Sequence, residues 1–132
     1  MPAVNWLAVV AAALSMFALG AVWYSPLLFV KPWAKAAGLE VDYDKRGNFA
    51  MILGISFDLT LVMAANLAFF VAGVTELVAV IGYAVAAGLG WAALSLWVIS
   101  LFERRPFAYV LINGGYLTVG FAILGLILGL WR

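Results

Sequence analysis

Residues 77–131 read LVAVIGYAVAAGLGWAALSLWVISLFERRPFAYVLINGGYLTVGFAILGLILGLW, and their only charges lie in the short Glu-Arg-Arg-Pro segment at 103–106. A helix of about 20 apolar residues rises about 30 Å, which is the thickness of the hydrocarbon core of a bilayer. Because lipid offers no partners to backbone N–H and C=O groups, such runs span as helices. The stretch therefore predicts two antiparallel transmembrane helices, at 77–102 and 107–131, joined by a tight turn.

Two more apolar runs precede this pair, at residues 4–24 and 48–71. The composition agrees, since 68% of the residues are hydrophobic and 10% are charged, against about 45–50% and about 25% in soluble proteins. The short turns after residues 71 and 102 place consecutive helices side by side and antiparallel. We expect one transmembrane domain over residues 1–132, an all-α bundle of four helices, with one sizeable polar loop at 31–47.

The basic residues predict how this bundle is oriented, because loops rich in Lys and Arg stay in the cytoplasm. One side of the predicted bundle carries a single basic residue, Arg132, and the other carries six. These six are Lys31, Lys35, Lys45, Arg46, Arg104 and Arg105. We therefore expect a multi-pass protein of the inner (cytoplasmic) membrane, with the 31–47 loop cytoplasmic and both termini periplasmic or extracellular. Within the loop, residues 32–37 are expected to form an interfacial helical turn that ends at Gly38.

The composition also excludes several classes of function. The chain has no cysteine and no histidine, which removes disulfides, thiolate chemistry, His-ligated haem and the common zinc sites. It has no basic patch of the kind that nucleic acid requires. No nucleophile–base pair or phosphate loop is present, so we expect no enzyme, no metal, no cofactor and no nucleic-acid partner.

Asp58 is the first candidate for a functional residue, because it falls near the middle of the 48–71 span. An ionised Asp at that depth costs about 2.5–3.5 kcal/mol. The side chain must therefore face the bundle interior, be protonated, or pair with another group. Two interpretations stay open: a proton- or cation-coupled site, and a neutral, hydrogen-bonded Asp that sets helix packing.

A second candidate follows from spacing in the last span. Tyr109, Asn113 and Tyr116, at positions i, i+4 and i+7, share one helical face. Together with Asp58 and Asn66 they could line a polar intramembrane site. The alternative is that each of them makes an ordinary interhelical hydrogen bond, worth about 0.6 kcal/mol in membrane bundles.

Small residues spaced by four predict where helices approach one another closely. One such stripe is Gly82, Ala86 and Gly90, and a second is Gly125 and Gly129. Small-residue stripes allow tight contact within a chain or between copies, and we expect internal packing. On the face of Tyr116, Gly120 is expected to admit another helix in the same way.

The two halves of the chain also align as a parallel two-plus-two repeat. Residues 49–64 match residues 107–122 at a constant offset, through identical Phe-Ala, Leu, Leu-Thr and Ala positions. In this alignment Tyr116 corresponds to Asp58, so that the two could meet across a pseudo-twofold axis. Apolar sequences also match by chance, so the repeat and chance identity both stay open.

The run GAVWYSPLLF at 20–29 is followed by Lys31-Pro32-Trp33, and the last span holds Asn113-Gly-Gly-Tyr116. This pattern resembles the bacterial membrane family catalogued as domain of unknown function 1761, and the resemblance covers nearly the whole chain. It implies a four-helix membrane protein and supplies no activity.

The same run predicts an interfacial anchor made of Trp23, Tyr24, Pro26, Lys31 and Trp33. Trp and Tyr favour the headgroup level, Pro ends a helix, and Lys meets anionic headgroups. Part of the run is also similar to a loop of the tryptophan-rich sensory protein family, whose members have five spans and bind porphyrins and sterols. This chain has four spans and different spacing, so we interpret that similarity as chance.

These observations leave two hypotheses of function. The first is a non-enzymatic structural or accessory module, embedded in the lipid bilayer as a homo-oligomer or as a subunit of a larger membrane complex. The second is a small proton- or cation-coupled transporter or channel that uses Asp58. A lipid- or pigment-binding protein is a third interpretation, which rests on the aromatic residues alone.

Overall fold

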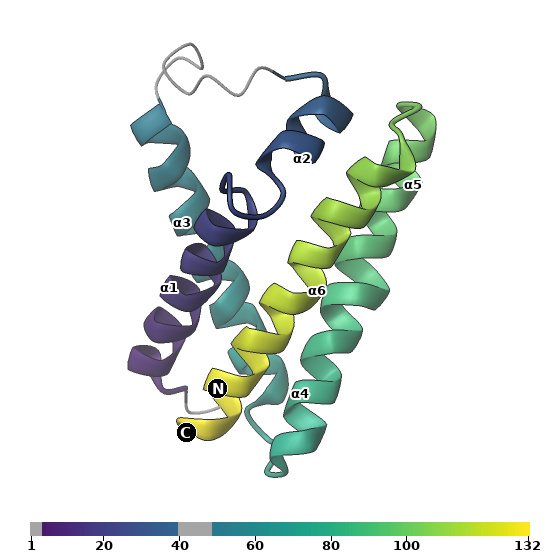
Figure 1. Cartoon of the computed structure of the whole chain (residues 1–132). Helices are drawn as coiled ribbons and strands as arrows, with labels where there is room; N and C mark the ends of the chain where they lie inside the picture. The colour runs from purple at the N-terminus through teal and green to yellow at the C-terminus, as the bar shows by residue number, and fades with distance from the viewer. Residues whose placement is uncertain (1–3, 40–48) are drawn as a thin grey trace.

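The computed structural model describes residues 4–39 and 49–132, and every regular element among them is a helix (Figure 1). The elements are α1 (Trp6–Trp23), α2 (Val30–Ala37), α3 (Phe49–Val71), α4 (Leu77–Val85), η2 (Ala86–Ala93), α5 (Leu94–Phe102) and α6 (Phe107–Leu130). The predicted spans are confirmed to within two residues at each end. The second part of the predicted polar loop, with Lys45 and Arg46, lies outside the described residues.

Four of these helices are long and apolar enough to cross a membrane, with α4, η2 and α5 running on as one rod from Leu77 to Phe102. The chain is therefore a multi-pass membrane protein. The start of α1 and the end of α6 lie at one end of the bundle, here called the terminus end, and α2 lies at the opposite end, the α2 end (Figure 1). Which side of the membrane each end occupies stays a prediction.

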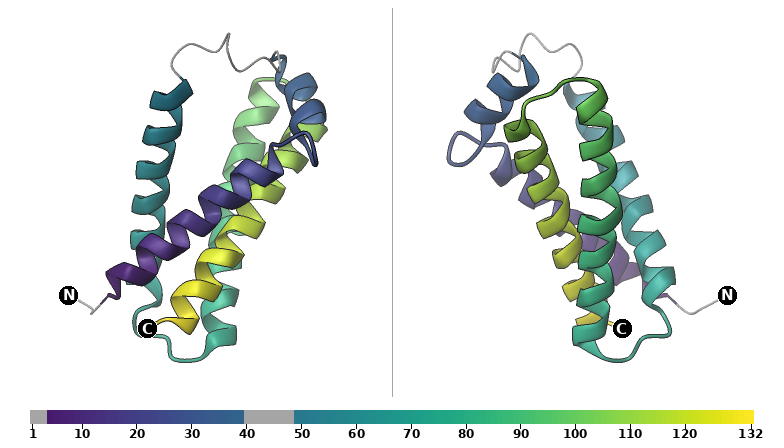
Figure 2. Two further views of the ribbon diagram at one scale, coloured as in Figure 1. Left: turned by 60° about the vertical axis from the view of Figure 1, so that its left-hand side comes forward. Right: turned by 90° about the vertical axis from the view of Figure 1, so that its right-hand side faces the viewer.

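The four spans pack in the spatial order α3, α1, α6 and then the α4–α5 rod, with neighbours antiparallel (Figures 1 and 2). Helix α6 is central, because it contacts α1 on one side and the rod on the other. Helix α3 contacts mainly α1. One consequence is that α3 is covered along a single face, and the rest of its surface is open.

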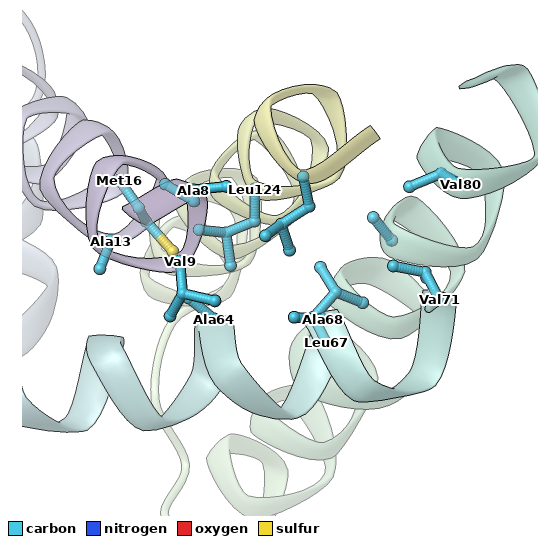
Figure 3. Close-up of a cluster of buried hydrophobic side chains, with 13 residues drawn as sticks. Ala8, Val9, Ala13, Met16, Ala64, Leu67, Ala68, Val71, Val80 and Leu124 are labelled. Carbon is cyan, nitrogen blue, oxygen red and sulfur yellow. The ribbon is translucent and has the colours of Figure 1, made fainter. Parts of the chain in front are cut away.

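The core cluster occupies the terminus half of the bundle, where α1, α3, α4 and α6 meet (Figure 3). Helix α1 contributes mostly alanines to it, including Ala8, Ala12 and Ala13, and α3 contributes Ala64 and Ala68. Such small side chains let backbones come close, which is how membrane helices gain packing contacts. Helix α1 crosses the bundle obliquely, so that it approaches α3 near the termini and separates from it toward α2 (Figure 2).

Glycines set the contact between α6 and its neighbours. An added Cβ at Gly125 would lie 2.5 Å from the Ala84 Cβ, and one at Gly129 would lie 2.6 Å from the Leu77 Cδ1. One at Gly120 would lie 2.6 Å from the Met16 Cε of α1. The close packing predicted for these three glycines is thus confirmed.

The stripe of Gly82, Ala86 and Gly90 was expected to pack internally, and that expectation is wrong. All three residues are exposed, and nothing lies within 4 Å of a Cβ added at either glycine. Gly88 faces α6 instead, within the π-helical segment η2, where an added Cβ would lie 2.6 Å from the Phe121 Cβ. Lipid and protein interior are equally apolar, so composition does not tell which stripe of a span faces inward.

Local hydrogen bonds and one glycine define several helix ends, and the sequence predicts one of these ends. At the start of α1, the Asn5 side chain caps the helix by accepting hydrogen bonds from the Leu7 and Ala8 amides. Helix α2 ends at Gly38, which has φ +71°, as predicted. At the terminus end the Arg132 guanidinium donates to the carbonyls of Val71, Ala72 and Val74. Arg132 thus joins the end of α6 to the last residue of α3 and to the turn that follows it.

Candidate functional site

A cleft of about 720 Å³ lies between α1, α3 and α6 in the α2 half of the bundle, where α1 and α3 separate. Its walls are largely apolar, formed by side chains such as Met16, Phe17, Leu53 and Met63. Trp33 from α2 also lines it. The cleft is within the size range of small-molecule sites, about 300–1,000 Å³.

Tyr24, Asn113 and Tyr116 contribute polar groups to the cleft wall on the α1–α6 side, and Ser56 and Thr60 contribute polar groups from α3. The Tyr24 hydroxyl donates to Asn113 Oδ1 over 2.5 Å. The rings of Trp33 and Tyr116 pack edge-on against the Tyr24 ring, at 5.2 and 5.5 Å between centroids. Burial, and to a lesser degree the nearby Tyr116 and Tyr109, raise the pKa of Tyr24, so its phenol stays a hydrogen-bond donor at neutral pH.

Tyr116 and Asn113 keep hydrogen-bonding capacity toward the cleft. The Tyr116 hydroxyl reaches the Met16 carbonyl only at 3.5 Å, beyond the usual O–H···O range of about 2.5–3.0 Å. The Asn113 carboxamide uses its oxygen for Tyr24, and its Nδ2 has no hydrogen-bond partner among residues 4–39 and 49–132. The site therefore presents donors to whatever enters it.

Tyr109 shares the helical face of Asn113 but does not line the cleft. The Arg105 guanidinium lies 5.3 Å from the centre of its ring, at the α2 end of the bundle. Arg105 also donates to the Ala37 carbonyl at the end of α2. Tyr109 thus belongs to the contact between α2 and the α5–α6 turn.

The residues predicted as an interfacial anchor divide into two groups. Pro26 and Lys31 are exposed, as an anchor requires, whereas Trp23, Tyr24 and Trp33 are half-buried. The Trp23 indole donates to the Ile112 carbonyl of α6 over 3.0 Å. The aromatic residues therefore join α1 and α2 to α6. An aromatic ring with one polar atom suits a headgroup and a helix contact equally well, which is why the sequence does not separate these roles.

Asp58 and Asn66 lie on a different surface from the cleft. Both are exposed, and neither lines the cleft. At 100° per residue, they fall on the face of α3 opposite its buried residues, together with the exposed Met51, Ile55 and Val62. We call these five residues the outward face of α3. Of the alternatives for Asp58, an interior position within one chain is excluded, and Asp58 does not meet Tyr116, as the open possibility of a repeat would have allowed.

No hydrogen bond or ion pair involves Asp58 or Asn66 within the part of the chain that the structure describes. Asp58 follows Phe49, the first residue of α3, by nine positions, so it lies about 14 Å along the helix. The five residues predicted to share one polar site are therefore distributed over three places: the cleft, the α2 contact and the outward face of α3.

Comparison with known proteins adds one match. The family described as Protein of unknown function (DUF1761) matches residues 7–129. No curated protein and no solved structure matches the chain.

Proposed function

The chain belongs to the DUF1761 family of unknown function, and from this premise we propose that it is a non-enzymatic membrane module that assembles as a homo-oligomer through the outward face of α3. The observation that carries the proposal is the position of Asp58 and Asn66 there, opposite the bundle and without a partner in the described residues. Their spacing of eight residues corresponds to about 12 Å along the helix. Two polar groups on one lipid-facing stripe are costly, and contact with another protein removes that cost.

A second copy of the chain is the partner that best matches this surface. Copies inserted in the same orientation and related by a twofold axis along the membrane normal bring identical residues to identical depth. Two Asn66 carboxamides can pair, because each has a donor and an acceptor. Two Asp58 carboxyls can share one proton in a hydrogen bond. Single polar residues of this kind fix register and partner number where helices pack along a stripe.

Cysteine cross-linking tests the proposal, because the chain has no native cysteine. Val62→Cys, on the outward face, should form an intermolecular disulfide in native membranes under mild oxidation. Val98→Cys is the matched control, an exposed valine on α5, and should stay monomeric. Equal cross-linking of both variants, or none at Val62→Cys, would contradict the assembly.

The polar pair itself is tested by Asp58→Leu combined with Asn66→Leu. Both residues are exposed in the single chain, so the bundle should still fold. The dimer fraction counted by single-molecule photobleaching in lipid vesicles should fall at least threefold. A dimer fraction equal to that of the wild type would remove these two side chains from the interface.

Proton- or cation-coupled transport through Asp58 is the alternative function. Asp58 does not line the cleft between α1, α3 and α6, so a transport path that uses it would form between copies. Asp58→Asn should then abolish coupled flux into liposomes while it leaves cross-linking at Val62→Cys unchanged. The absence of any flux in the wild type would leave the structural module as the sole function.

The inner membrane is the proposed location, on the basis of the basic residues of the loops.

A further inference from the structure

We propose that the cleft between α1, α3 and α6 binds a membrane lipid that carries a carbonyl oxygen on an apolar chain, with the carbonyl held by Asn113 and Tyr116. This inference does not rest on the proposed assembly, because the cleft and the outward face lie on different sides of α3. The polar donors, the apolar wall and the depth of the site together indicate the chemical class of the ligand.

The donors require an acceptor. The Asn113 Nδ2 offers two N–H groups that have no partner in the described chain, and the Tyr116 hydroxyl makes only a 3.5 Å contact. An amide left without a hydrogen bond in an apolar medium costs several kcal/mol, so the site favours a ligand that brings an oxygen acceptor. Tyr24 holds Asn113 Oδ1, which directs the carboxamide N–H groups away from Tyr24.

The charge of the lining excludes other acceptors. None of the described side chains around the cleft is charged, so a carboxylate or phosphate would enter without a counterion. Burying an unpaired anion costs far more than burying a neutral carbonyl. A carbonyl oxygen accepts two hydrogen bonds without bringing a charge.

The depth of Asn113 places this acceptor within the membrane. Asn113 follows Phe107, the first residue of α6, by six positions, so it lies about 9 Å along a helix of about 36 Å. A ligand that reaches it must therefore come through lipid. Along the rest of the cleft, Met16, Phe17, Leu53, Met63 and Leu117 offer an apolar wall to its chain. Two common lipids have this chemistry, namely a glycerolipid with its ester carbonyl and a quinone with its ring carbonyl.

Native mass spectrometry of the full chain, released from native membranes in mild detergent, tests the proposal. We expect one lipid retained per chain. Its mass distinguishes a glycerolipid from a quinone, and a quinone also absorbs in the near ultraviolet. Asn113→Leu keeps the side-chain volume but removes both donors, and should lower occupancy at least tenfold.

Two further variants distinguish loss of the binding site from loss of the fold. Leu53→Trp fills the cleft from α3, where Leu53 is 40% exposed, leaves the Tyr24–Asn113 pair intact, and should also expel the lipid. Asn66→Leu makes the same chemical change as Asn113→Leu on the outward face, and should leave occupancy unchanged. Wild-type protein without a retained lipid, or equal occupancy in Asn113→Leu and Asn66→Leu, would overturn the proposal. Measuring the oligomeric state tests the proposed assembly separately, because Asn113→Leu should leave the oligomeric state unaltered.

Discussion

The Tyr24 hydroxyl donates a hydrogen bond to the Asn113 carboxamide oxygen across 89 positions of sequence. The bond joins the end of α1 to the first third of α6, at the point where the Trp-Tyr-Ser-Pro run turns toward α2. The bond uses the carboxamide oxygen, and the two N–H groups of this cleft-lining residue have no partner in the described chain. Helix packing and the proposed lipid site thus depend on the same pair.

Tyr24→Phe removes this hydrogen bond and leaves Asn113 Oδ1 unpaired. Membrane hydrogen bonds are worth about 0.6 kcal/mol on average and at most about 1.7 kcal/mol, so we expect a loss of about 1 kcal/mol. Unfolding in mixed micelles titrated with SDS measures it. Tyr83→Phe is the control, because Tyr83 is 60% exposed, and it should change stability by less than about 0.5 kcal/mol. Equal effects of the two variants would show that the Tyr24 bond adds nothing.

Gly125→Ala should destabilise the bundle strongly, because the new Cβ would lie 2.5 Å from the Ala84 Cβ and 3.3 Å from the Ile81 Cα. Overpacking of this kind costs about 1–3 kcal/mol. Gly90→Ala has open space and should be neutral or slightly stabilising, since Ala is the better helix former. Thermal aggregation of the two purified variants compares them, and a more stable Gly125→Ala would contradict the α4–α6 contact.

Arg132→Gln should destabilise the end of α3 and the turn after it, because the guanidinium donates hydrogen bonds to the carbonyls of Val71, Ala72 and Val74. Hydrogen exchange of the amides around the α3–α4 turn should become faster, while exchange in α6 near Asn113 stays unchanged. Lys31→Gln is the control for loss of one exposed positive charge. If the turn exchanges equally in both variants, Arg132 has no capping role.

The orientation can be tested with single cysteines at exposed positions of opposite ends. Thr75→Cys lies in the α3–α4 turn at the terminus end, and Leu39→Cys lies after α2. From the bias of six basic residues to one, an impermeant maleimide should label Thr75→Cys in intact cells. Leu39→Cys should react only after the membrane is opened. The reverse labelling pattern would show that the bundle has the opposite orientation in the membrane.

The apolar runs were sufficient to predict the four spans and their antiparallel order. Asn113, Tyr116 and Gly120 were also correctly assigned to one face, because helical spacing is a local property. The partners of that face could not be predicted. Met16 and Tyr24 meet this face because α1 crosses the bundle obliquely, and that crossing depends on which alanines and glycines pack together.

The amino-acid pattern thus specifies which segments cross the membrane and that each crosses as a helix, since backbone groups without water partners admit few alternatives. Only the tertiary structure decides which stripe of each span faces inward. Gly88 rather than Gly82 contacts α6, and Asp58 faces outward rather than toward Tyr116. The physical reason is that lipid tails are as apolar as a protein core, so hydrophobicity distinguishes no side of a membrane helix and shape complementarity selects the contact.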